Sequence, residues 1–445
     1  MSDVTADFVT GSRSRRNHPQ RRTLRTGRDG ATGRRAGARA RLRLVSMPRT
    51  ADGELQTGLA VSMVVLVVLL SLIGSVMILS ASSVAAIDLG GSSFSVFFKQ
   101  CLWLVAGLAA MGIGARTDYH RWADRVPLLV IGSVGLLTLV LVPGVGINVN
   151  GAQRWIGAGG FQLQPAEPAK FALIVFVAAL VAREQHRILD LRVVLRPVLI
   201  VLGVMLTLLM LQPNLGTSAV LCATVGCMLL WSGLPIRVLS SLAALGAGAG
   251  LVFALSADYR RARVTAFLDP WADAGDTGYQ TIQSLIGVAS GGISGTGLGE
   301  SRAKWGFLPE AHTDFVFSII SEELGLVGSL IVVGLFAAMI GCALRIAARS
   351  RDTFGSMLAV GVGAWFSVQG FVNVGAVLGI LPITGVPLPF VSFGGSSLLA
   401  TMLAAGVLVN VALQSRAPES PVRERIAARR AANVATSASS RTVTP

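Results

Sequence analysis

Long apolar runs alternate with short polar segments over most of this chain. Ten runs stand out: 58–81, 96–114, 126–142, 167–182, 195–212, 216–232, 237–256, 315–344, 354–380 and 397–414. Most are close to the ~20 residues that cross the hydrocarbon core of a bilayer as a helix. The pattern predicts an all-α polytopic membrane protein with about ten transmembrane helices in a membrane domain over 57–414.

Arginine placement predicts the orientation of these helices. Basic residues gather in one set of short loops, at 115–125, 183–192 and 345–351. The alternate loops contain neither lysine nor arginine: 82–95, 212–216 and 381–396. Cytoplasmic loops are enriched in these cations, so an even number of spans places both termini in the cytoplasm. The long loops 143–166, between spans 3 and 4, and 257–314, between spans 7 and 8, are then on the outer face.

Composition supports the membrane domain and separates it from two basic tails. Only 14% of the residues are charged, against about 25% in soluble domains. Residues 1–56 and 415–445 together carry +12 of the net charge of +15. The first segment is predicted to be a disordered Arg-rich cytoplasmic arm, and the second a basic cytoplasmic tail. Nucleic-acid binding is one interpretation of such an arm, but attraction to anionic lipid is favoured because a membrane anchor follows directly.

Neither a metal site nor a cofactor motif is indicated. The four cysteines all lie in apolar runs, so a disulfide framework is not predicted. The run Ser290–Gly299 is rich in glycine like a phosphate cradle, but it lacks the Gly-Lys-Ser/Thr ending of a P-loop. A glycine loop lining a cavity is the favoured interpretation. The sequence leaves open whether a divalent cation takes part.

The segment 381–396 is uncharged and carries three prolines. Proline disrupts a helix interior, so the segment cannot be helical throughout. Non-helical backbone at membrane depth is tolerated where it is buried in protein or lines a cavity. We therefore expect this loop to dip into the protein.

Ionisable residues at the ends of spans are candidates for function, because charge at membrane depth is costly. Glu167 and Lys170 are three residues apart and can pair on one helix face, either for stability alone or for function. Asp314 either caps the eighth helix or carries chemistry. With Ser318 and Glu322 it forms a polar stripe, and capping does not account for Glu322 two turns deeper.

Several separate motifs carry a family resemblance. They are Asn150-Gly151-Ala152-Gln153-Arg154-Trp155-Ile156, Gln164-Pro165-Ala166-Glu167-Pro168-Ala169-Lys170, Gln212-Pro213-Asn214-Leu215-Gly216-Thr217, Gly297-Leu298-Gly299, Leu308-Pro309-Glu310-Ala311-His312-Thr313-Asp314-Phe315, Glu322-Glu323-Leu324-Gly325 and Ser392-Phe393-Gly394-Gly395-Ser396-Ser397. In order and spacing the sequence resembles the SEDS (shape, elongation, division, sporulation) proteins, which polymerise the peptidoglycan precursor lipid II. The Pro-Glu-Ala-His-Thr-Asp-Phe motif is more similar to cell-division members than to elongation members.

The resemblance implies an inverting glycosyltransferase and assigns roles to residues. Asp314 corresponds to the family's essential aspartate and would be the general base. Arg154, Lys170 and Lys304 would hold or orient the pyrophosphate of the donor. Trp155 would contact sugar or lipid, and Glu167 would hold Lys170. The same motifs imply further substrate contacts from Glu310, His312, Ser392, Gly394 and Gly395.

The resemblance also implies partners and a place of action. The substrate would be lipid II, consumed on the outer face of the cytoplasmic membrane during septal wall synthesis. A class B penicillin-binding transpeptidase and other divisome proteins would be partners, and nucleic acid would not. An elongation-type polymerase, a lipid II flippase and a non-catalytic divisome scaffold remain as alternatives.

Overall fold

The computed structural model describes residues 51–88, 94–149, 152–158, 161–187, 190, 192–255, 261, 265–309 and 311–415. Most of the predicted arm and nearly all of the basic tail lie outside the described residues. The last part of the predicted arm, 51–56, already belongs to helix α1 (Ala51–Asp88). The first helix thus begins earlier than the hydrophobic pattern indicates, because polar residues such as Glu54 and Gln56 continue it beyond the apolar run.

Within the described residues, ten long helices coincide with the ten predicted apolar runs. After α1 they are α2 (Ser95–Arg116), α4 (Val126–Leu139), α5 (Ala166–Arg183), α6 (Leu195–Leu211), α7 (Leu215–Trp231), α8 (Ile236–Leu255), α11 (Val316–Ala348), α12 (Thr353–Val377) and α13 (Gly395–Gln414). This confirms the all-α fold. Five of them, α1, α2, α11, α12 and α13, are long and apolar enough to cross a membrane by length and composition. That all ten cross it, with both termini in the cytoplasm, stays a prediction.

The two long loops contain short elements that the sequence analysis did not predict. Segment 143–166 folds into an antiparallel sheet of β1 (Gly146–Val149), β2 (Ala152–Ala158) and β3 (Phe161–Leu163), in that order. The remaining short elements are α3 (His120–Asp124), η1 (Gln185–Arg187), η2 (Pro270–Asp273), α10 (Tyr279–Ser290) and η3 (Ala303–Phe307). An open sheet edge needs water or protein partners, so the sheet agrees with a segment outside the hydrocarbon core.

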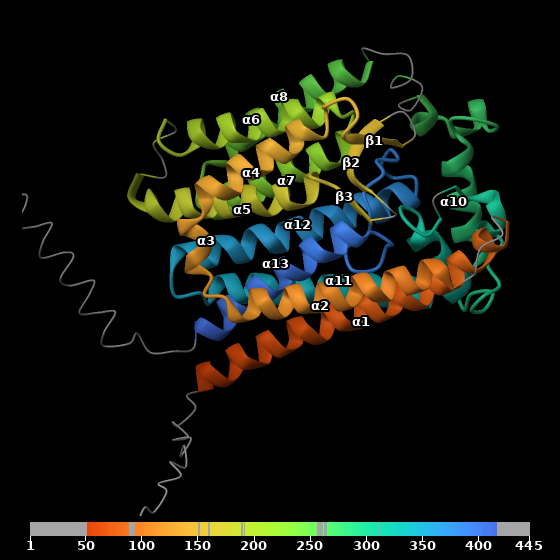
Figure 1. Ribbon diagram of the computed structural model, residues 1–445, viewed down its shortest axis with the longest axis horizontal. Coiled ribbons are helices and arrows are strands. Elements are labelled where there is room, and N and C mark those ends of the chain that lie inside the picture. The colour runs from red at the N-terminus through yellow and green to blue at the C-terminus, as the bar shows by residue number, and fades with distance from the viewer. Residues whose placement is uncertain are drawn as a thin grey trace, which may run out of the picture. The chain divides into compact units, whose positions relative to one another are not determined.

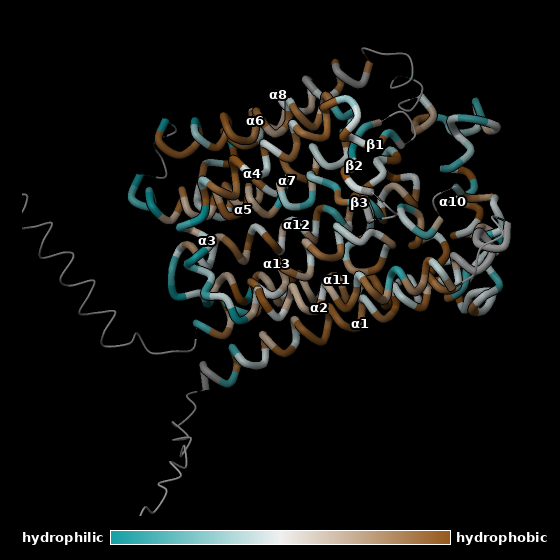
Figure 2. The backbone as a smooth tube through the Cα atoms, in the orientation of Figure 1, coloured by the Kyte–Doolittle hydropathy of each residue, from teal (hydrophilic) through white to brown (hydrophobic). Residues whose placement is uncertain are grey.

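Helix α12 lies in the middle of the helix bundle. It packs against α5, α7, α11 and α13, and α2 packs along α13. The side chains of Trp365 and Phe366 on α12 are fully buried. Figure 2 shows hydrophobic residues along the bodies of the helices and hydrophilic ones gathered toward their ends. A polar side chain on α12 can therefore reach elements on several sides of the bundle.

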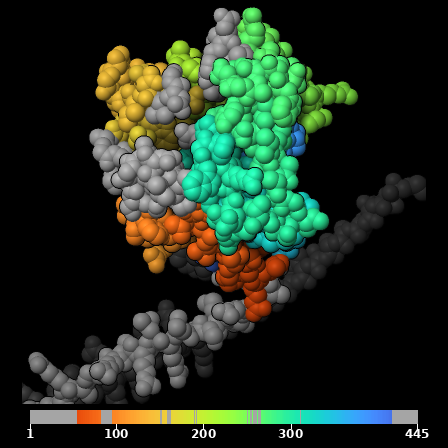
Figure 3. Space-filling model, turned by 90° about the vertical axis from the view of Figure 1, so that its right-hand side faces the viewer, coloured from red at the N-terminus to blue at the C-terminus, as the bar shows by residue number. Residues whose placement is uncertain are grey.

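The helices bring the predicted basic loops to one end of the bundle, where α3 lies, and the sheet and α10 to the other (Figure 1). Figure 3 looks onto the second end, where the sheet and residues 265–309 occupy different parts of the face, with helix α1 at its lower edge. The arginine-rich short loops lie at the end opposite this face, which agrees with the orientation that the positive-inside bias predicts.

A cluster of charged residues connects two segments at the end of the bundle where the basic loops lie. His120 Nδ1 lies 2.9 Å from Asp118 Oδ1, and its Nε2 lies 3.6 Å from Asp352 Oδ2. The hydrogen bond to Asp352 raises the pKa of His120, although burial opposes this. Burial also opposes the charged form of Asp118, but hydrogen bonds from His120 outweigh it and lower the pKa of Asp118 to about 2. The cluster joins the segment after α2 to the start of α12.

A close crossing of α2 and α13 gives a test of the packing. A Cβ atom on Gly114 would lie 2.7 Å from the carbonyl oxygen of Leu403 on α13. We expect Gly114→Ala to lower the free energy of unfolding by about 1–3 kcal/mol, because the helices must separate. Gly112→Ala on the same helix is the control, since its Cβ would meet nothing within 4 Å. Thermal unfolding in detergent measures both, and equal midpoints for the two variants would contradict the packing.

Candidate functional site

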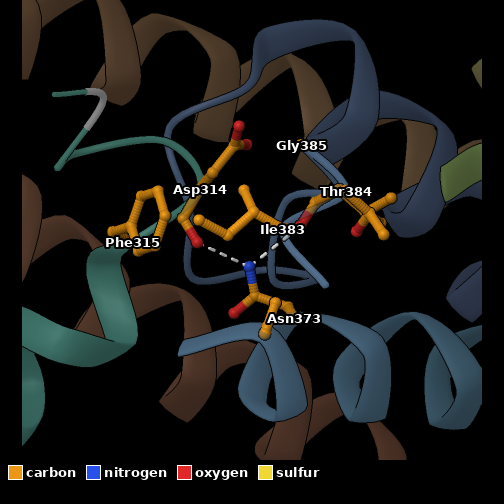
Figure 4. A pocket seen from close by; sticks show the side chains of 8 residues that line it. Asp314, Phe315, Asn373, Ile383, Thr384 and Gly385 are labelled. Carbon is orange, nitrogen blue, oxygen red and sulfur yellow. Dashed lines mark hydrogen bonds between the residues drawn. The ribbon is translucent and has the colours of Figure 1, made fainter. Parts of the chain in front are cut away.

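Asp314 lies in the turn that leads into α11. The N-cap of α11 is Phe315, and no side chain caps this helix. Of the two interpretations of Asp314, capping of the helix is therefore not the one that the structure supports. Asp314 is half-buried and lines a small pocket with Phe315, Asn373, Ala376, Ile383, Thr384, Gly385 and Val386. Figure 4 shows the carboxylate pointing away from Asn373 and the main-chain oxygen pointing toward it.

The Pro-rich loop, residues 381–394, forms the other side of this pocket. It contains no helix or strand, as predicted. A Cβ atom on Gly216 at the start of α7 would lie 2.6 Å from Val386 Cγ2, and one on Gly74 of α1 would lie 2.5 Å from the oxygen of Val391. The loop is thus held between α1 and α7. Because Val386 and Val391 are buried, the prediction that this segment dips into the protein is confirmed.

Arg154 on β2 lies close to Gly385, one of the residues that line this pocket. Its Nε donates a hydrogen bond of 3.2 Å to the carbonyl oxygen of Gln212, and its Nη2 donates to the carbonyl oxygen of Pro213. Gly385 has φ +68°, and a Cβ atom there would lie 3.4 Å from Asp314 Oδ2 and 4.0 Å from Arg154 Nη1. A carboxylate and a guanidinium from segments 160 residues apart in sequence therefore flank one glycine.

The predicted Glu167–Lys170 ion pair is confirmed. Lys170 Nζ lies 2.9 Å from Glu167 Oε1, and both side chains are buried. Lys170 Nζ also donates a hydrogen bond of 2.7 Å to Gln369 Oε1 and lies 4.9 Å from the centre of the Trp365 ring. Its ammonium group thus has several protein partners. A role of Lys170 in orienting the donor pyrophosphate stays a prediction.

Lys304 takes part in a second buried network. Its Nζ lies 3.5 Å from Glu323 Oε1 on α11 and donates to the carbonyl oxygen of Gly299. The same Glu323 oxygen accepts a hydrogen bond of 2.5 Å from Ser80 Oγ on α1. The sequence analysis assigned Lys304 to the pyrophosphate, whereas the structure gives it an ion pair between η3 and α11. Binding of substrate by Lys304 stays a prediction.

Ser318 and Glu322, the two residues of the polar stripe that lie on α11, bind neighbouring segments of the chain. Glu322 accepts hydrogen bonds from Ser301 Oγ at 2.5 Å and from the main-chain nitrogen of Arg302 at 2.9 Å. Ser318 Oγ donates 3.0 Å to the carbonyl oxygen of Ser284 on α10. The depth of Glu322, which capping left unexplained, is explained by its contacts with the segment that follows the glycine run.

Of the other residues predicted to contact substrate, His312 lies beside the Pro-rich loop and Trp155 lies on the sheet. The carbonyl oxygen of His312 accepts a hydrogen bond of 3.0 Å from the main-chain nitrogen of Phe393, and the two rings are 5.7 Å apart. Trp155 is half-buried on β2, opposite Ile147 of β1. Glu310 lies outside the described residues. The substrate contacts predicted for these three residues stay predictions.

Ser392, Gly394 and Gly395 have structural contacts at the end of the Pro-rich loop. Ser392 Oγ accepts a hydrogen bond of 2.9 Å from the main-chain nitrogen of Leu388. Gly394 is the N-cap of α13. A Cβ atom on Gly395 would lie 2.1 Å from the ring of Trp103, so only glycine fits there. Packing and turn geometry thus account for these residue types, and their predicted substrate contacts stay predictions.

Two amide side chains on α12 contact the site although they were not predicted to belong to it. Asn373 Nδ2 donates to the carbonyl oxygens of Asp314 at 2.7 Å and of Val386 at 2.9 Å. Gln369 Nε2 donates 2.9 Å to the carbonyl oxygen of Pro387. The available signal was their spacing of four residues in an otherwise apolar helix, which places both on one face.

Comparison with known proteins places the chain in a family. The family model described as "Cell cycle protein", FTSW_RODA_SPOVE, matches residues 60–417. A probable peptidoglycan glycosyltransferase FtsW from Geobacter metallireducens is 38% identical, over 78% of this chain and 93% of the relative. Stage V sporulation protein E from Bacillus subtilis is 40% identical, over 80% of this chain and 97% of the relative.

Two solved structures show the same fold. One chain from a study titled "Structural coordination of polymerization and crosslinking by a peptidoglycan synthase complex" has a TM-score of 0.63 and 29% identity, over 79% of this chain and 97% of that one. The rod shape determining protein RodA of Thermus thermophilus has a TM-score of 0.59 and 27% identity, over 80% of this chain and 97% of that one. The chain therefore belongs to the FtsW/RodA/SpoVE family of cell cycle proteins, as its motifs predicted.

Proposed function

We propose that this chain is a peptidoglycan glycosyltransferase that polymerises lipid II into glycan strands. The observation that carries the proposal is the meeting of Asp314 Oδ2 and Arg154 Nη1 around Gly385. Glycosyl transfer to a hydroxyl needs a base for the acceptor and positive charge for the leaving group. Family membership supports the same reaction, since relatives of similar length are named peptidoglycan glycosyltransferases.

The proposed reaction transfers a glycan chain from its undecaprenyl pyrophosphate to the 4-hydroxyl of an acceptor sugar. Asp314 takes the proton as the acceptor oxygen attacks the anomeric carbon. The bond from that carbon to the pyrophosphate oxygen breaks, and the pyrophosphate leaves with the electron pair. Attack from the opposite face inverts the anomeric carbon. Arg154, anchored on the carbonyl oxygens of Gln212 and Pro213, stabilises the negative charge of the leaving group.

The site is proposed to act on the outer face of the cytoplasmic membrane. The sheet lies at one end of the helices and the arginine-rich loops lie at the other (Figure 1), and Asp314 is close to Arg154 on the sheet, across Gly385. If the basic loops face the cytoplasm, the pocket opens where lipid-linked precursors meet the growing wall. The arginine-rich arm and the basic tail are proposed to lie on the cytoplasmic side.

The finer proposal is a role in septal wall synthesis with a transpeptidase partner. Several relatives carry the name FtsW, which favours division over elongation. One structural neighbour belongs to a complex that coordinates polymerisation and crosslinking. We therefore propose a class B penicillin-binding protein and other divisome proteins as partners, with lipid II as the substrate.

Product formation from purified lipid II in detergent tests the proposed function. The full chain, alone and with a candidate class B penicillin-binding protein, is expected to yield polymer that is separated from lipid II on a gel. A flippase or a scaffold would give no polymer, because neither joins sugars. Lipid II that remains unpolymerised in both reactions, although the protein is folded, would overturn the proposal. Transport of lipid II across vesicles without polymer would favour the flippase.

A further inference from the structure

Two buried amide side chains on α12 connect the separate parts of the candidate site. Gln369 and Asn373 are at most 2% exposed and lie four residues apart on one helix face. They donate to consecutive carbonyl oxygens of the Pro-rich loop, those of Pro387 and Val386, each at 2.9 Å. This pair of side chains, called the amide clamp below, extends from the ion pair of α5 to the turn that holds Asp314.

Near Asp314, both hydrogen bonds of the amide clamp come from one nitrogen atom of Asn373. Asn373 Nδ2 has two hydrogens, and it donates to the carbonyl oxygens of both Asp314 and Val386. Asp314 precedes Phe315, the N-cap of α11, so its carbonyl lies outside the ladder of helical hydrogen bonds. Val386 adjoins Gly385, which faces the Asp314 carboxylate. One side chain therefore sets the position of Asp314 relative to the loop opposite it (Figure 4).

Gln369, the other residue of the amide clamp, is held by a hydrogen bond from Lys170. Gln369 Oε1 accepts hydrogen bonds from Lys170 Nζ and from Trp365 Nε1, each at 2.7 Å. Two donors at this oxygen fix the orientation of the amide, so that its nitrogen must face the carbonyl oxygen of Pro387. The Glu167–Lys170 pair is thereby connected to the Pro-rich loop through Gln369.

The chemistry of the loop explains why amides stand on α12. Proline has no main-chain N–H, and the prolines in this loop prevent regular pairing of its carbonyl oxygens. Buried carbonyl oxygens need donors, and a primary amide supplies two neutral N–H groups from one atom. Within the described residues, Asn373 Oδ1 has no hydrogen-bond partner. A buried acceptor without a partner costs free energy, which offsets part of the stability that the two hydrogen bonds of Asn373 contribute.

We propose that Gln369 and Asn373 are positioning residues that hold Asp314, the Pro-rich loop and Lys170 in register for glycosyl transfer. This inference rests on the proposed function. Neither side chain exchanges protons or charge with substrate. Loss of the clamp displaces the carboxylate from the acceptor hydroxyl, and a displacement of about 1 Å can lower a rate about 10²-fold.

Kinetics of Asn373 variants test the proposal against a matched control. Asn373→Leu removes both donors, whereas Asn373→Asp keeps one when its carboxyl group is protonated, as burial favours. Asn410→Leu on α13 is the control, because Asn410 is equally buried and donates 2.7 Å to the carbonyl oxygen of Ala115 at the opposite end of the bundle. The full chain is assayed for lipid II polymerisation, with thermal unfolding measured in parallel.

We expect kcat to fall in the order wild type, Asn373→Asp, Asn373→Leu, with a total loss of about 10–10²-fold and a KM changed by less than about twofold. Asn410→Leu should lower the unfolding midpoint and leave kcat unchanged. If Asn373→Leu does not fold, the kcat of Asn373→Asp still tests the proposal, because it is expected to be lower than that of the wild type. A wild-type kcat in the Asn373 variants, or an equal loss in Asn410→Leu, would overturn the inference alone. A folded wild-type chain without polymer would overturn the proposed function and this inference with it.

Discussion

Replacement of Asp314 by asparagine is expected to lower the rate of lipid II polymerisation by about 10²–10⁴-fold, the contribution of a general base. Asparagine has the same size and keeps a polar group, but it cannot take the proton of the acceptor hydroxyl. The side chain is not a helix cap, so the variant should unfold at nearly the wild-type temperature. The loss should therefore appear in kcat, with the amount of folded protein unchanged.

Asp273→Asn is a suitable control for this experiment. Asp273 lies in the same long segment between α8 and α11, and its carboxylate accepts hydrogen bonds from Thr277 at an exposed position. Its replacement should leave polymerisation within about twofold of the wild type, as expected for a surface residue outside the site. Steady-state rates with purified lipid II measure both variants. Full polymer yield from Asp314→Asn would exclude Asp314 as the base and with it the mechanism proposed for this chain.

The helices could be predicted because a bilayer imposes a strong requirement on sequence. A span needs about 20 apolar residues, and the ten runs coincide with the ten helices in the described part of the chain. The loop predicted at 212–216 separates α6 from α7. The elements of the two long loops were not predicted, because such short elements need no long apolar run. Helix α10 has only twelve residues within a glycine-rich segment, and the strands are shorter still.

Only part of the candidate site was predicted from the sequence. Contacts between residues close together in the chain could be predicted, whereas contacts between distant segments could not. The Glu167–Lys170 pair is local, so helical spacing was enough to predict it. The ion pair of Lys304 with Glu323 joins η3 to α11, and no periodicity in the sequence relates the two. The lysine was assigned to the pyrophosphate from its positive charge and from the family resemblance. Its carboxylate partner becomes evident only once α11 and η3 are packed together.

Polar residues without charge were the largest omission. Asn373 and Gln369 stand in a helix that is otherwise apolar, and neither belongs to the motifs that carry the family resemblance. Their importance depends on what lies opposite them, namely the carbonyl oxygens of a loop rich in proline. Charge at membrane depth is a signal that can be read from a sequence, whereas a need for hydrogen-bond donors can be read only from the fold.

Replacement of Lys170 by methionine is expected to destabilise the protein by about 3–5 kcal/mol, because it leaves the buried carboxylate of Glu167 without its cation. Both side chains are at most 3% exposed. Within the described residues, Glu167 Oε2 has no hydrogen-bond partner, so no second donor is in place to compensate. Unfolding of the purified chain in detergent, followed by denaturant titration, measures the loss. A wild-type midpoint for Lys170→Met would contradict the view that this pair is a stabilising contact.

The double variant, with Glu167→Gln added to Lys170→Met, separates stability from function. Removal of both charges leaves no unpaired ion, so most of the lost stability should return. If Lys170 only supports the Pro-rich loop through Gln369, polymerisation returns with stability, since Trp365 Nε1 still orients the Gln369 amide. If the ammonium group of Lys170 binds the leaving pyrophosphate, the double variant is stable and remains slow. A double variant as unstable as Lys170→Met would show that the cost does not arise from the unpaired carboxylate.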